Sequence, residues 1–259
     1  MASAVSSLAS GSGNDRFNAE AASWDSNPFV HTASEQALQA LLSRFPDLSK
    51  SRAADKRLDV LEIGCGTGLL SCLIAPYAGQ VVAVDAADGM IDVLKQKLQQ
   101  PGFPPNIYPI SVLLEDPEDP VLPPADPNER DGPRLKYDLI ISHLVLHHIA
   151  DLRSVLKTML GCLKKGGFVA LTDFEDFGSE AKRFHAQSKM AGVERHGIHA
   201  TTMETLMRDV GFGNVRVDRA WAMDKRVEKY DGEFGKGRGT RGQGEIMSFP
   251  FVLCLGERL

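Results

Sequence analysis

Apolar positions along the chain repeat in blocks that alternate between strand spacing and helix spacing. Continuous apolar runs predict buried strands at "RLDVLEIG", "QVVAVD", "NIYPISVLLED", "YDLIISHLVL" and "FVALTDF". Between them, apolar residues at helical spacing predict helices in "LLSCLIAPYAG", "DGMIDVLKQKLQQPG" and "DLRSVLKTMLGCLKKGG". Strands that alternate with helices indicate βαβ units, and therefore a parallel sheet covered by helices on both faces.

Capping residues predict where two helices begin and end. Asp151 precedes an apolar helical stripe, and a basic pair with a glycine (164–166) follows it, as N-caps, the helix dipole and C-caps favour. Thr32 and Glu35 form a capping-box pattern, which predicts that a further helix begins near residue 32, ahead of the first strand.

The last third of the chain departs from the alternation. "TTMETLMRDVGF" predicts a helix, whereas "NVRVDRAWAM" and "IMSFPFVLCLGE" predict two strands joined without a helix, so one of them is expected to be antiparallel. The organisation predicted is a disordered tail rich in Ser, Ala and Gly (1–16) and one α/β domain (17–259). That domain divides into an N-terminal helical cap (17–57), a central half (58–173) and a closing part (174–259).

Composition restricts the classes of function. The chain has 259 residues, 43 % of them hydrophobic and 24 % charged, with a net charge of -5. Nucleic acids and anionic membranes select basic surfaces, so the acidic balance argues against both as partners. No apolar stretch reaches the roughly 18 to 20 residues of a membrane span, and the N-terminus lacks the pattern of a secretory signal.

Four cysteines show neither a C-x-x-C pair nor the spacing of a zinc site: Cys65, Cys72, Cys162 and Cys254. They are interpreted as buried, reduced thiols of a cytoplasmic protein.

A glycine loop follows the first predicted strand. Gly64, Gly66 and Gly68 lie at a strand-to-helix junction, where a ligand can approach the backbone beside the helix N-terminus. The spacing G-x-G-x-G differs from the dinucleotide fingerprint G-x-G-x-x-G, which argues against a nicotinamide oxidoreductase. Glu62 adds a carboxylate that would repel a pyrophosphate and suit an ammonium group. Asp85 ends the second strand, where an acid can accept both ribose hydroxyls. The pattern predicts a pocket for a ribose joined to a zwitterionic or cationic group.

Three longer segments carry a family resemblance. "VLEIGCGTGLLS", "VVAVDAADGMIDVLKQK" and "YDLIISHLVLHHIADLRSVLKTMLGCLKKGGFVALTD" resemble the successive motifs of class I S-adenosylmethionine-dependent methyltransferases. They are most similar to the small-molecule branch that includes the quinone-biosynthesis C-methyltransferases. The resemblance covers residues 58–173. It implies a Rossmann-like, doubly wound sheet of seven strands, mostly parallel with an antiparallel last strand.

The resemblance also implies S-adenosylmethionine as cofactor, bound by residues 58–173, with the acceptor held by residues 174–259. The glycine-loop backbone would line the methionine part with help from Glu62, and Asp85 would hold the ribose. Ala86 and Met90 would flank the adenine, and a pair of acids after the third strand would contact its amino group. Trp24 would close over the cofactor from the N-terminal segment. The implied cofactor-binding residues are Trp24, Glu62, Gly64, Cys65, Gly66, Gly68, Asp85, Ala86, Met90, Glu115, Asp116 and His143.

Histidines are the candidate bases, because their pKa lies near neutral pH and an acceptor that arrives protonated needs a base. His196 and His199 flank a glycine after the fifth strand, where this architecture builds its acceptor pocket. His147, in "LHHI", is the third candidate. The alternatives are buried packing for His147 and a solvated loop for the other two. No metal-ligand spacing stands out, so no metal is predicted.

A second loop leaves the partner open. Lys236, Arg238 and Arg241 lie among glycines, a composition that can bind RNA, but the acids between them favour a solvated connection. The function predicted is methyl transfer to a small-molecule acceptor at O, S, N or C. The alternative is a methyltransferase-like module that acts on or through a protein or RNA partner. Nothing in the sequence indicates the nucleophile or the oligomeric state.

Overall fold

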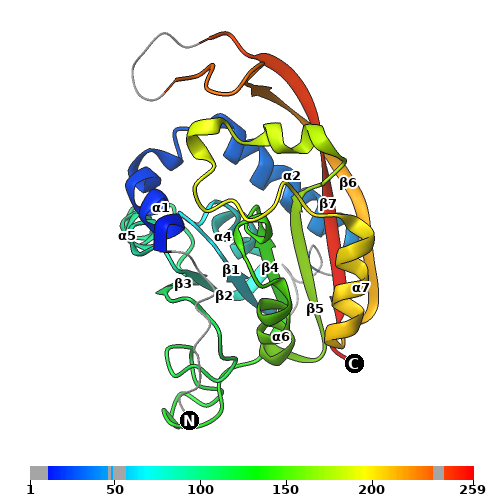
Figure 1. Cartoon of the computed structure of the whole chain (residues 1–259). Helices are drawn as coiled ribbons and strands as arrows, with labels where there is room; N and C mark the ends of the chain where they lie inside the picture. The colour runs from blue at the N-terminus through cyan, green and yellow to red at the C-terminus, as the bar shows by residue number, and fades with distance from the viewer. Residues whose placement is uncertain (1–10, 46–47, 49–56, 236–241) are drawn as a thin grey trace, which may run out of the picture.

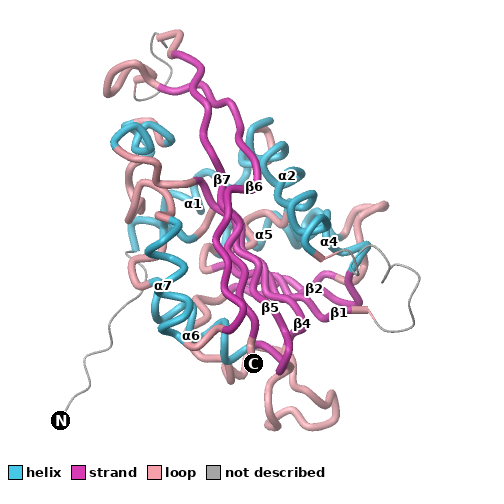
Figure 2. The backbone as a smooth tube through the Cα atoms, turned by 90° about the vertical axis from the view of Figure 1, so that its right-hand side faces the viewer, coloured by secondary structure: helices cyan, strands magenta, loops and turns pink. Residues whose placement is uncertain are grey.

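One seven-stranded sheet forms the centre of the computed structural model, which describes residues 11–45, 48, 57–235 and 242–259. The strand order is β3-β2-β1-β4-β5-β7-β6. The first five strands in the chain pair in parallel, and β7 runs antiparallel to both of its neighbours, β5 and β6. Figure 2 shows β6 and β7 side by side. This arrangement confirms the predicted fold class. The strands are β1 (Leu58–Ile63), β2 (Ala78–Asp85), β3 (Ile107–Ser111), β4 (Tyr137–His143), β5 (Leu163–Phe174), β6 (Gly213–Val227) and β7 (Glu245–Glu257).

Helices cover both faces of the sheet (Figure 1). One face carries α2 (Pro28–Arg44), α4 (Leu69–Ile74) and α5 (Asp88–Leu98), whose buried apolar residues form one core cluster with the sheet. The other face carries α6 (Leu152–Cys162) and α7 (Ala200–Val210), which form a second cluster. The remaining elements are α1 (Gly11–Trp24), packed on α5, and the short 3-10 turns η1 (Ala75–Tyr77), η2 (Leu146–His148), η3 (Ser179–Phe184) and η4 (Gln187–Lys189).

The central strands are apolar through their middle because both of their faces are covered. Val60 packs in the cluster under α4, and its neighbour Leu61 packs in the cluster under α6, both fully buried. Successive strand residues point to opposite faces, so the middle of a strand between two helix layers needs apolar residues on both faces. This explains the continuous runs in the sequence.

Helix α6 begins as predicted, since the Asp151 side chain accepts a hydrogen bond from the Ser154 N–H at 3.1 Å. The predicted C-cap is wrong. The helix ends at Cys162, and the segment 163–166 already belongs to β5. Lys164 is used there to bridge Asp59 and Asp138, with Nζ to oxygen distances of 2.7 and 2.8 Å.

Helix α2 begins one turn earlier than the capping-box pattern predicts. Asn27 is the N-cap and accepts a hydrogen bond from the Phe29 N–H, while Pro28 occupies the first turn, where a missing N–H costs nothing. Thr32 lies inside the helix and donates to the Pro28 carbonyl. The prediction failed because Asn-Pro is a stronger start signal than Thr-x-x-Glu at this position.

The boundary of the predicted tail also moves. Residues 11–16, which the prediction assigned to the tail, form the beginning of α1. Phe17 and Trp24 of α1 pack against Ala87, the N-cap of α5, and against Met90 in the first turn of α5. Residues 1–10 lie outside the described part of the chain, as do Lys236, Arg238 and Arg241 of the glycine-rich loop. Among the described helices, none combines the length and apolar character needed to cross a membrane.

Candidate cofactor and acceptor cavity

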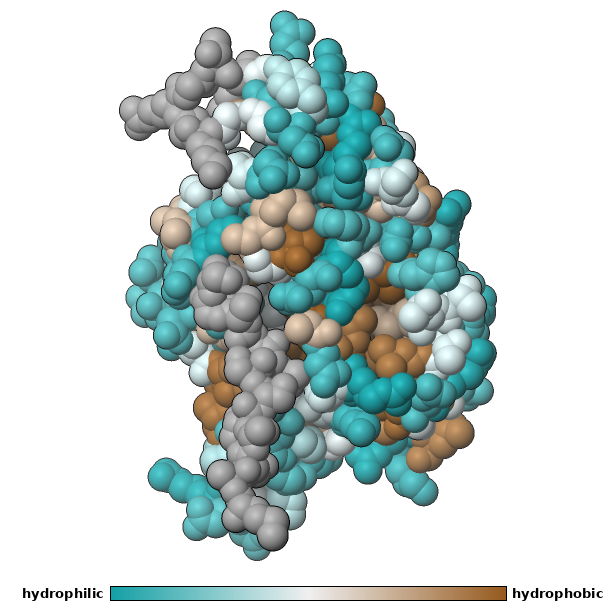
Figure 3. Space-filling view, in the orientation of Figure 1, coloured by the Kyte–Doolittle hydropathy of each residue, from teal (hydrophilic) through white to brown (hydrophobic). Residues whose placement is uncertain are grey.

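A cavity of about 300 Å³ lies at the carboxyl ends of β1, β2 and β4. Residues of α1 and of the segment 184–189 form the opposite wall, so the cavity is covered from outside the sheet. In Figure 3 the surface is mostly hydrophilic, with hydrophobic side chains recessed between hydrophilic ones. The strand order reverses between β1 and β4, and ligands of doubly wound sheets bind at such a switch point.

The glycine loop forms one side of the cavity and needs glycine for conformational reasons. Gly64, Gly66 and Gly68 have φ angles of +74°, +53° and +77°, a region that side chains other than glycine rarely adopt. A Cβ on Gly64 would lie 2.4 Å from Val145, whereas a Cβ on Gly66 would meet no atom within 4 Å. Gly66 therefore presents bare backbone to open space. Gly68 is the N-cap of α4 and is not part of the cavity wall.

Asp85 joins the loop to the start of α5. One carboxylate oxygen accepts from the Gly66 N–H and the other from the Ala87 N–H, both at 2.8 Å. Burial raises the pKa of Asp85, while these backbone hydrogen bonds oppose that rise. The side chain lines the cavity together with Ala86 and Met90, where the sequence placed all three.

Glu62 is a buried acid at the base of the same loop, 2 % exposed. The Ser71 hydroxyl donates to its carboxyl group. Burial is the largest cause that raises the pKa of Glu62 to about 8, with a smaller contribution from Asp85. Because Glu62 and Asp85 both carry carboxyl groups, the loop end of the cavity favours a cationic ligand.

Asp25 ties the N-terminal segment to the glycine loop. It accepts from the Thr67 hydroxyl at 2.5 Å and pairs with the Lys97 ammonium of α5 at 2.6 Å. Nearby, Trp24 packs edge-on against Phe17, with ring centroids 5.9 Å apart, and both line the cavity. These contacts hold α1 over the loop.

His143 ends β4 and faces the cavity. Its Nδ1 lies 2.9 Å from the Thr172 hydroxyl, and its buried Nε2 has no hydrogen-bond partner among the described residues. Burial lowers the pKa of His143 to about 4, so the ring is neutral at neutral pH.

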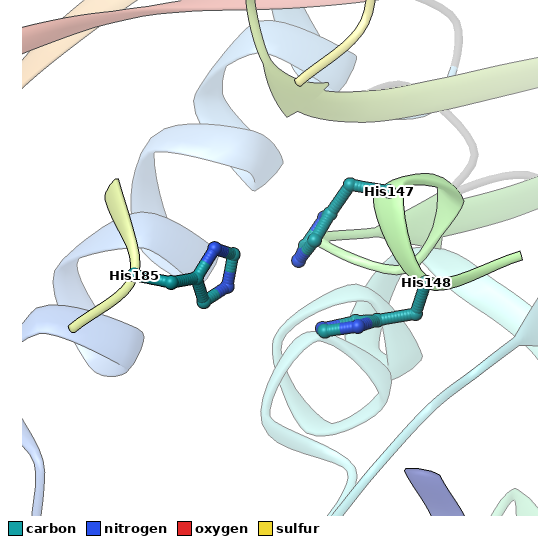
Figure 4. Close-up of side chains that lie close together, drawn as sticks. All are labelled: His147, His148 and His185. Carbon is teal, nitrogen blue, oxygen red and sulfur yellow. The ribbon is translucent and has the colours of Figure 1, made fainter. Parts of the chain in front are cut away.

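Three further histidines line the far end of the cavity, and Figure 4 shows their rings turned toward one another. His147 and His148 come from η2, and His185 follows η3. The His147 Nδ1 lies 2.8 Å from an oxygen of the fully buried Asp173. Burial lowers the pKa of His148 to about 3, and that of His185 still further.

Aromatic rings and one lysine complete this end. Phe184 stacks on Phe174 with ring centroids 3.9 Å apart. The Lys225 ammonium lies 3.6 Å from the Phe184 ring centroid and 4.7 Å from that of Phe29. Burial lowers the pKa of Lys225 to about 7. The far end is thus apolar with basic nitrogens, in contrast to the acidic loop end.

The cavity brings together most of the predicted site residues. Nine of the twelve predicted cofactor-binding residues and one candidate base are in its wall: Trp24, Glu62, Gly64, Cys65, Gly66, Asp85, Ala86, Met90, His143 and His147.

Four predicted side chains are not in that wall. Glu115 and Asp116 are exposed beyond β3, and the wall there consists of residues 112–114 instead. His199 is the N-cap of α7, where its Nδ1 accepts from the Thr202 N–H, and His196 is exposed. The two residues between these histidines, Gly197 and Ile198, are buried, and the Ile198 N–H donates to the Phe174 carbonyl at the end of β5. The geometry thus gives His196 and His199 no contact with the cavity.

Sequence reasoning missed His185, Lys225 and Asp173. His185 and Lys225 lie in segments whose apolar pattern is irregular or strand-like. Asp173 was readable as the polar residue at the carboxyl end of the fifth strand, the edge at which such sheets place functional side chains.

The fold is that of class I S-adenosylmethionine-dependent methyltransferases. The chain belongs to the methyltransferase domain family, whose family model matches residues 29–217.

Individual relatives differ in what they act on. An uncharacterized methyltransferase of Schizosaccharomyces pombe is 28 % identical over 167 residues, 62 % of this chain and 55 % of that protein. The tRNA 5-carboxymethoxyuridine methyltransferase of Escherichia coli K12 is 30 % identical over 147 residues, 57 % of this chain and 52 % of that one. A ubiquinone biosynthesis O-methyltransferase of a Methylobacterium species is 27 % identical over 165 residues, 62 % and 60 % of the two chains.

The chain spans about half the length of the first two relatives. Among solved structures, the DhpI–SAH complex has a TM-score of 0.57 at 18 % identity, covering 94 % of each chain, which supports the fold. Because a tRNA methyltransferase is among the relatives, the prediction that nucleic acid is not a partner is not supported.

Proposed function

We propose that this chain binds S-adenosylmethionine at the glycine loop and transfers its methyl group to an acceptor held at the histidine end of the same cavity. The observation that carries this proposal is the continuity of the cavity. Its wall runs without interruption from Asp85 and Gly66 to His147 and Lys225, so a cofactor and an acceptor can meet inside it.

Each part of the cofactor has a matching surface. The Asp85 carboxylate would accept the ribose hydroxyls, and Ala86 and Met90 would flank the adenine beneath Trp24. Glu62 and the glycine-loop backbone would receive the methionine part, whose ammonium and sulfonium groups are both cations. The acidic loop end favours such a ligand over a dinucleotide with its anionic pyrophosphate.

The chemistry asks little of the protein beyond positioning. The acceptor's lone pair attacks the methyl carbon, and the S–CH3 bond breaks with its electron pair going to the sulfur, which leaves neutral S-adenosylhomocysteine. Proximity and a linear approach supply most of the acceleration. Where the acceptor carries a proton, a neutral histidine can take it, and His147 is the best placed because Asp173 would stabilise its charged form.

The acceptor we propose is a small molecule with an oxygen nucleophile. The cavity is covered by α1 and the segment 184–189, which suits a compact acceptor. The ubiquinone biosynthesis O-methyltransferase among the relatives supports oxygen as the attacked atom. The tRNA methyltransferase supports the second candidate, a nucleotide. A base within a nucleic acid would have to leave its stack to enter such a cavity.

We also propose a cytoplasmic location. All four cysteines are free, and three of them are buried, which supports a protein that works in a reducing compartment.

The test is S-adenosylhomocysteine release from S-adenosylmethionine, with a panel of phenols, carboxylates, thiols, amines and total tRNA. Turnover restricted to one oxygen class supports the proposal, and turnover with tRNA alone supports the second candidate. Tight cofactor binding without turnover on any member would contradict the proposed acceptor.

A further inference from the structure

Three histidines at the acceptor end present nitrogen atoms to one point. One ring nitrogen each from His147, His148 and His185 lies within 4.8 Å of the other two (Figure 4). The ring centroid of His147 lies 3.9 Å from that of His148 and 5.0 Å from that of His185. The cluster joins η2 to the segment after η3 across the cavity.

Hydrogen bonds fix which nitrogen is free in two of the rings. The His148 Nδ1 lies 2.6 Å from the Gly192 carbonyl, which can only accept, so Nδ1 carries the proton and Nε2 keeps its lone pair. The His147 Nδ1 donates to Asp173, whose carboxylate also accepts from the His147 and Phe174 N–H groups. In the neutral ring, the lone pair of His147 is therefore on Nε2.

Two ring nitrogens of the cluster are buried without a hydrogen-bond partner among the described residues. The His147 ring is 2 % exposed, and its Nε2 makes no hydrogen bond among the described residues. The buried Nδ1 of His185 has none either. A buried polar atom without a partner is destabilising, so two such nitrogens in one histidine cluster point to a ligand that accepts lone pairs.

We propose that His147, His148 and His185 bind a divalent transition-metal ion, Zn²⁺ above all, with an open fourth position toward the cavity. Imidazole nitrogen is a preferred zinc ligand, and three protein ligands with one open position are the pattern of catalytic rather than structural sites. Asp173 adds the carboxylate that orients a metal-bound imidazole from behind.

The geometry needs a small adjustment. In a tetrahedral site with Zn–N bonds of about 2.0–2.1 Å, ligand nitrogens lie roughly 3.4 Å apart, so the three rings must draw together. His185 follows a short 3-10 turn and is half-buried, so it is the ring with freedom to move. His147 and His148 are held by Asp173 and Gly192.

The surrounding charge is mixed. Arg16 and Lys225 also line the cavity, and their positive charges oppose a cation, whereas Asp173 favours one. A fourth ligand with negative charge, such as an acceptor oxygen, would offset the two cations. Under the proposed function, the metal would lower the pKa of that oxygen and hold it near the cofactor. In the metal-bound protein, His147 would be a ligand, and the metal would replace it as the group that favours loss of the acceptor's proton.

The test measures metal binding directly and needs no acceptor. Purified, chelator-treated protein is titrated with Zn²⁺ by calorimetry, and Co²⁺ substitution is followed by visible absorption. We expect one ion per chain and the intense visible bands of four-coordinate Co²⁺. His185→Ala is expected to weaken Zn²⁺ binding by at least about 10-fold, and Asp173→Asn by about 10- to 100-fold, as for other residues behind metal ligands.

The matched control is His31→Ala, an exposed histidine on α2 outside the cavity, which is expected to bind Zn²⁺ like the parent. Thermal unfolding of each variant without metal verifies that it folds. The metal site is overturned if the parent does not bind Zn²⁺, or if the parent and His185→Ala bind Zn²⁺ with equal affinity. The Zn²⁺ titration does not depend on methyl transfer. If no acceptor in the panel is methylated, the proposed function fails, but the result of the titration is unaffected.

Discussion

Asp85 accepts a hydrogen bond from the Gly66 backbone N–H at 2.8 Å, which links the end of β2 to the middle of the glycine loop. The same carboxylate holds the N–H of Ala87 at the start of α5. One side chain therefore sets the position of both walls of the proposed cofactor site. In the proposed complex, the same carboxylate would also accept the ribose hydroxyls.

Gly66→Ala is expected to weaken S-adenosylhomocysteine binding more than it weakens the fold. A Cβ there meets no protein atom, so the fold loses only the cost of a positive φ, about 1–2 kcal/mol. The Cβ would instead occupy the cavity where the cofactor approaches the backbone. Calorimetric binding and thermal unfolding measure the two effects separately.

Gly102→Ala is the matched control, because Gly102 also has a positive φ of +93° and open space around a Cβ, but lies outside the cavity. It is expected to lose similar stability and no affinity. Equal loss of affinity in both variants would show that the effect at Gly66 is global strain.

Glu62 is expected to couple binding to pH. Its pKa of about 8 means that it is protonated in the free protein at pH 7, and a cationic ligand beside it favours the ionised form. Affinity for S-adenosylhomocysteine should therefore rise with pH up to about 8, with proton release below that pH. Calorimetry in buffers of different ionisation enthalpy measures the release, which Glu62→Gln should abolish.

The free protein should show the opposite trend in stability. Between the ordinary value of 4.5 and about 8, native Glu62 holds a proton that the unfolded chain has lost, so the free energy of unfolding falls as pH rises. This contribution is complete below about pH 4.5. If the free energy of unfolding falls equally steeply with pH in Glu62→Gln, the pH dependence belongs to other groups.

Asp25→Ala is expected to loosen the cover formed by α1. The substitution removes the hydrogen bond from Thr67 and the ion pair with Lys97. At about 1 kcal/mol for a lost hydrogen bond, cofactor affinity should fall about 5-fold, and limited proteolysis within α1 should accelerate. Asp209→Ala, which breaks only an exposed ion pair with Arg153, is the control and should change neither. Unchanged proteolysis in Asp25→Ala would mean that α1 is held by its apolar contacts alone.

Most of the fold, and the glycine-loop end of the site, could be predicted from local sequence patterns. The apolar runs of β1 and β2, the glycine spacing and Asp85 lie next to one another in sequence, so their spatial relation follows from one βαβ unit. Capping signals were less reliable where two competed, as Asn27 and Thr32 did at the start of α2.

The acceptor end could not be read in this way. His185 meets His147 only because the segment after β5 folds back over the sheet in two short 3-10 turns, which have no apolar periodicity. The sequence favoured His196 and His199 because they flank a glycine after the fifth strand, yet both are exposed and His199 caps α7. That irregular path decides which histidines converge. For the same reason, the ligands of the proposed metal site show no recognisable spacing in the sequence.

The central claim is that the cavity binds the cofactor through Asp85. The most direct measurement is the calorimetric affinity of S-adenosylhomocysteine for the parent, Asp85→Asn and the exposed-loop control Asp126→Asn. We predict binding by the parent and the control, and a loss of about 10- to 100-fold in Asp85→Asn, as expected for hydrogen bonds to a charged group. No binding by the parent, or equal affinity in all three proteins, would contradict the account.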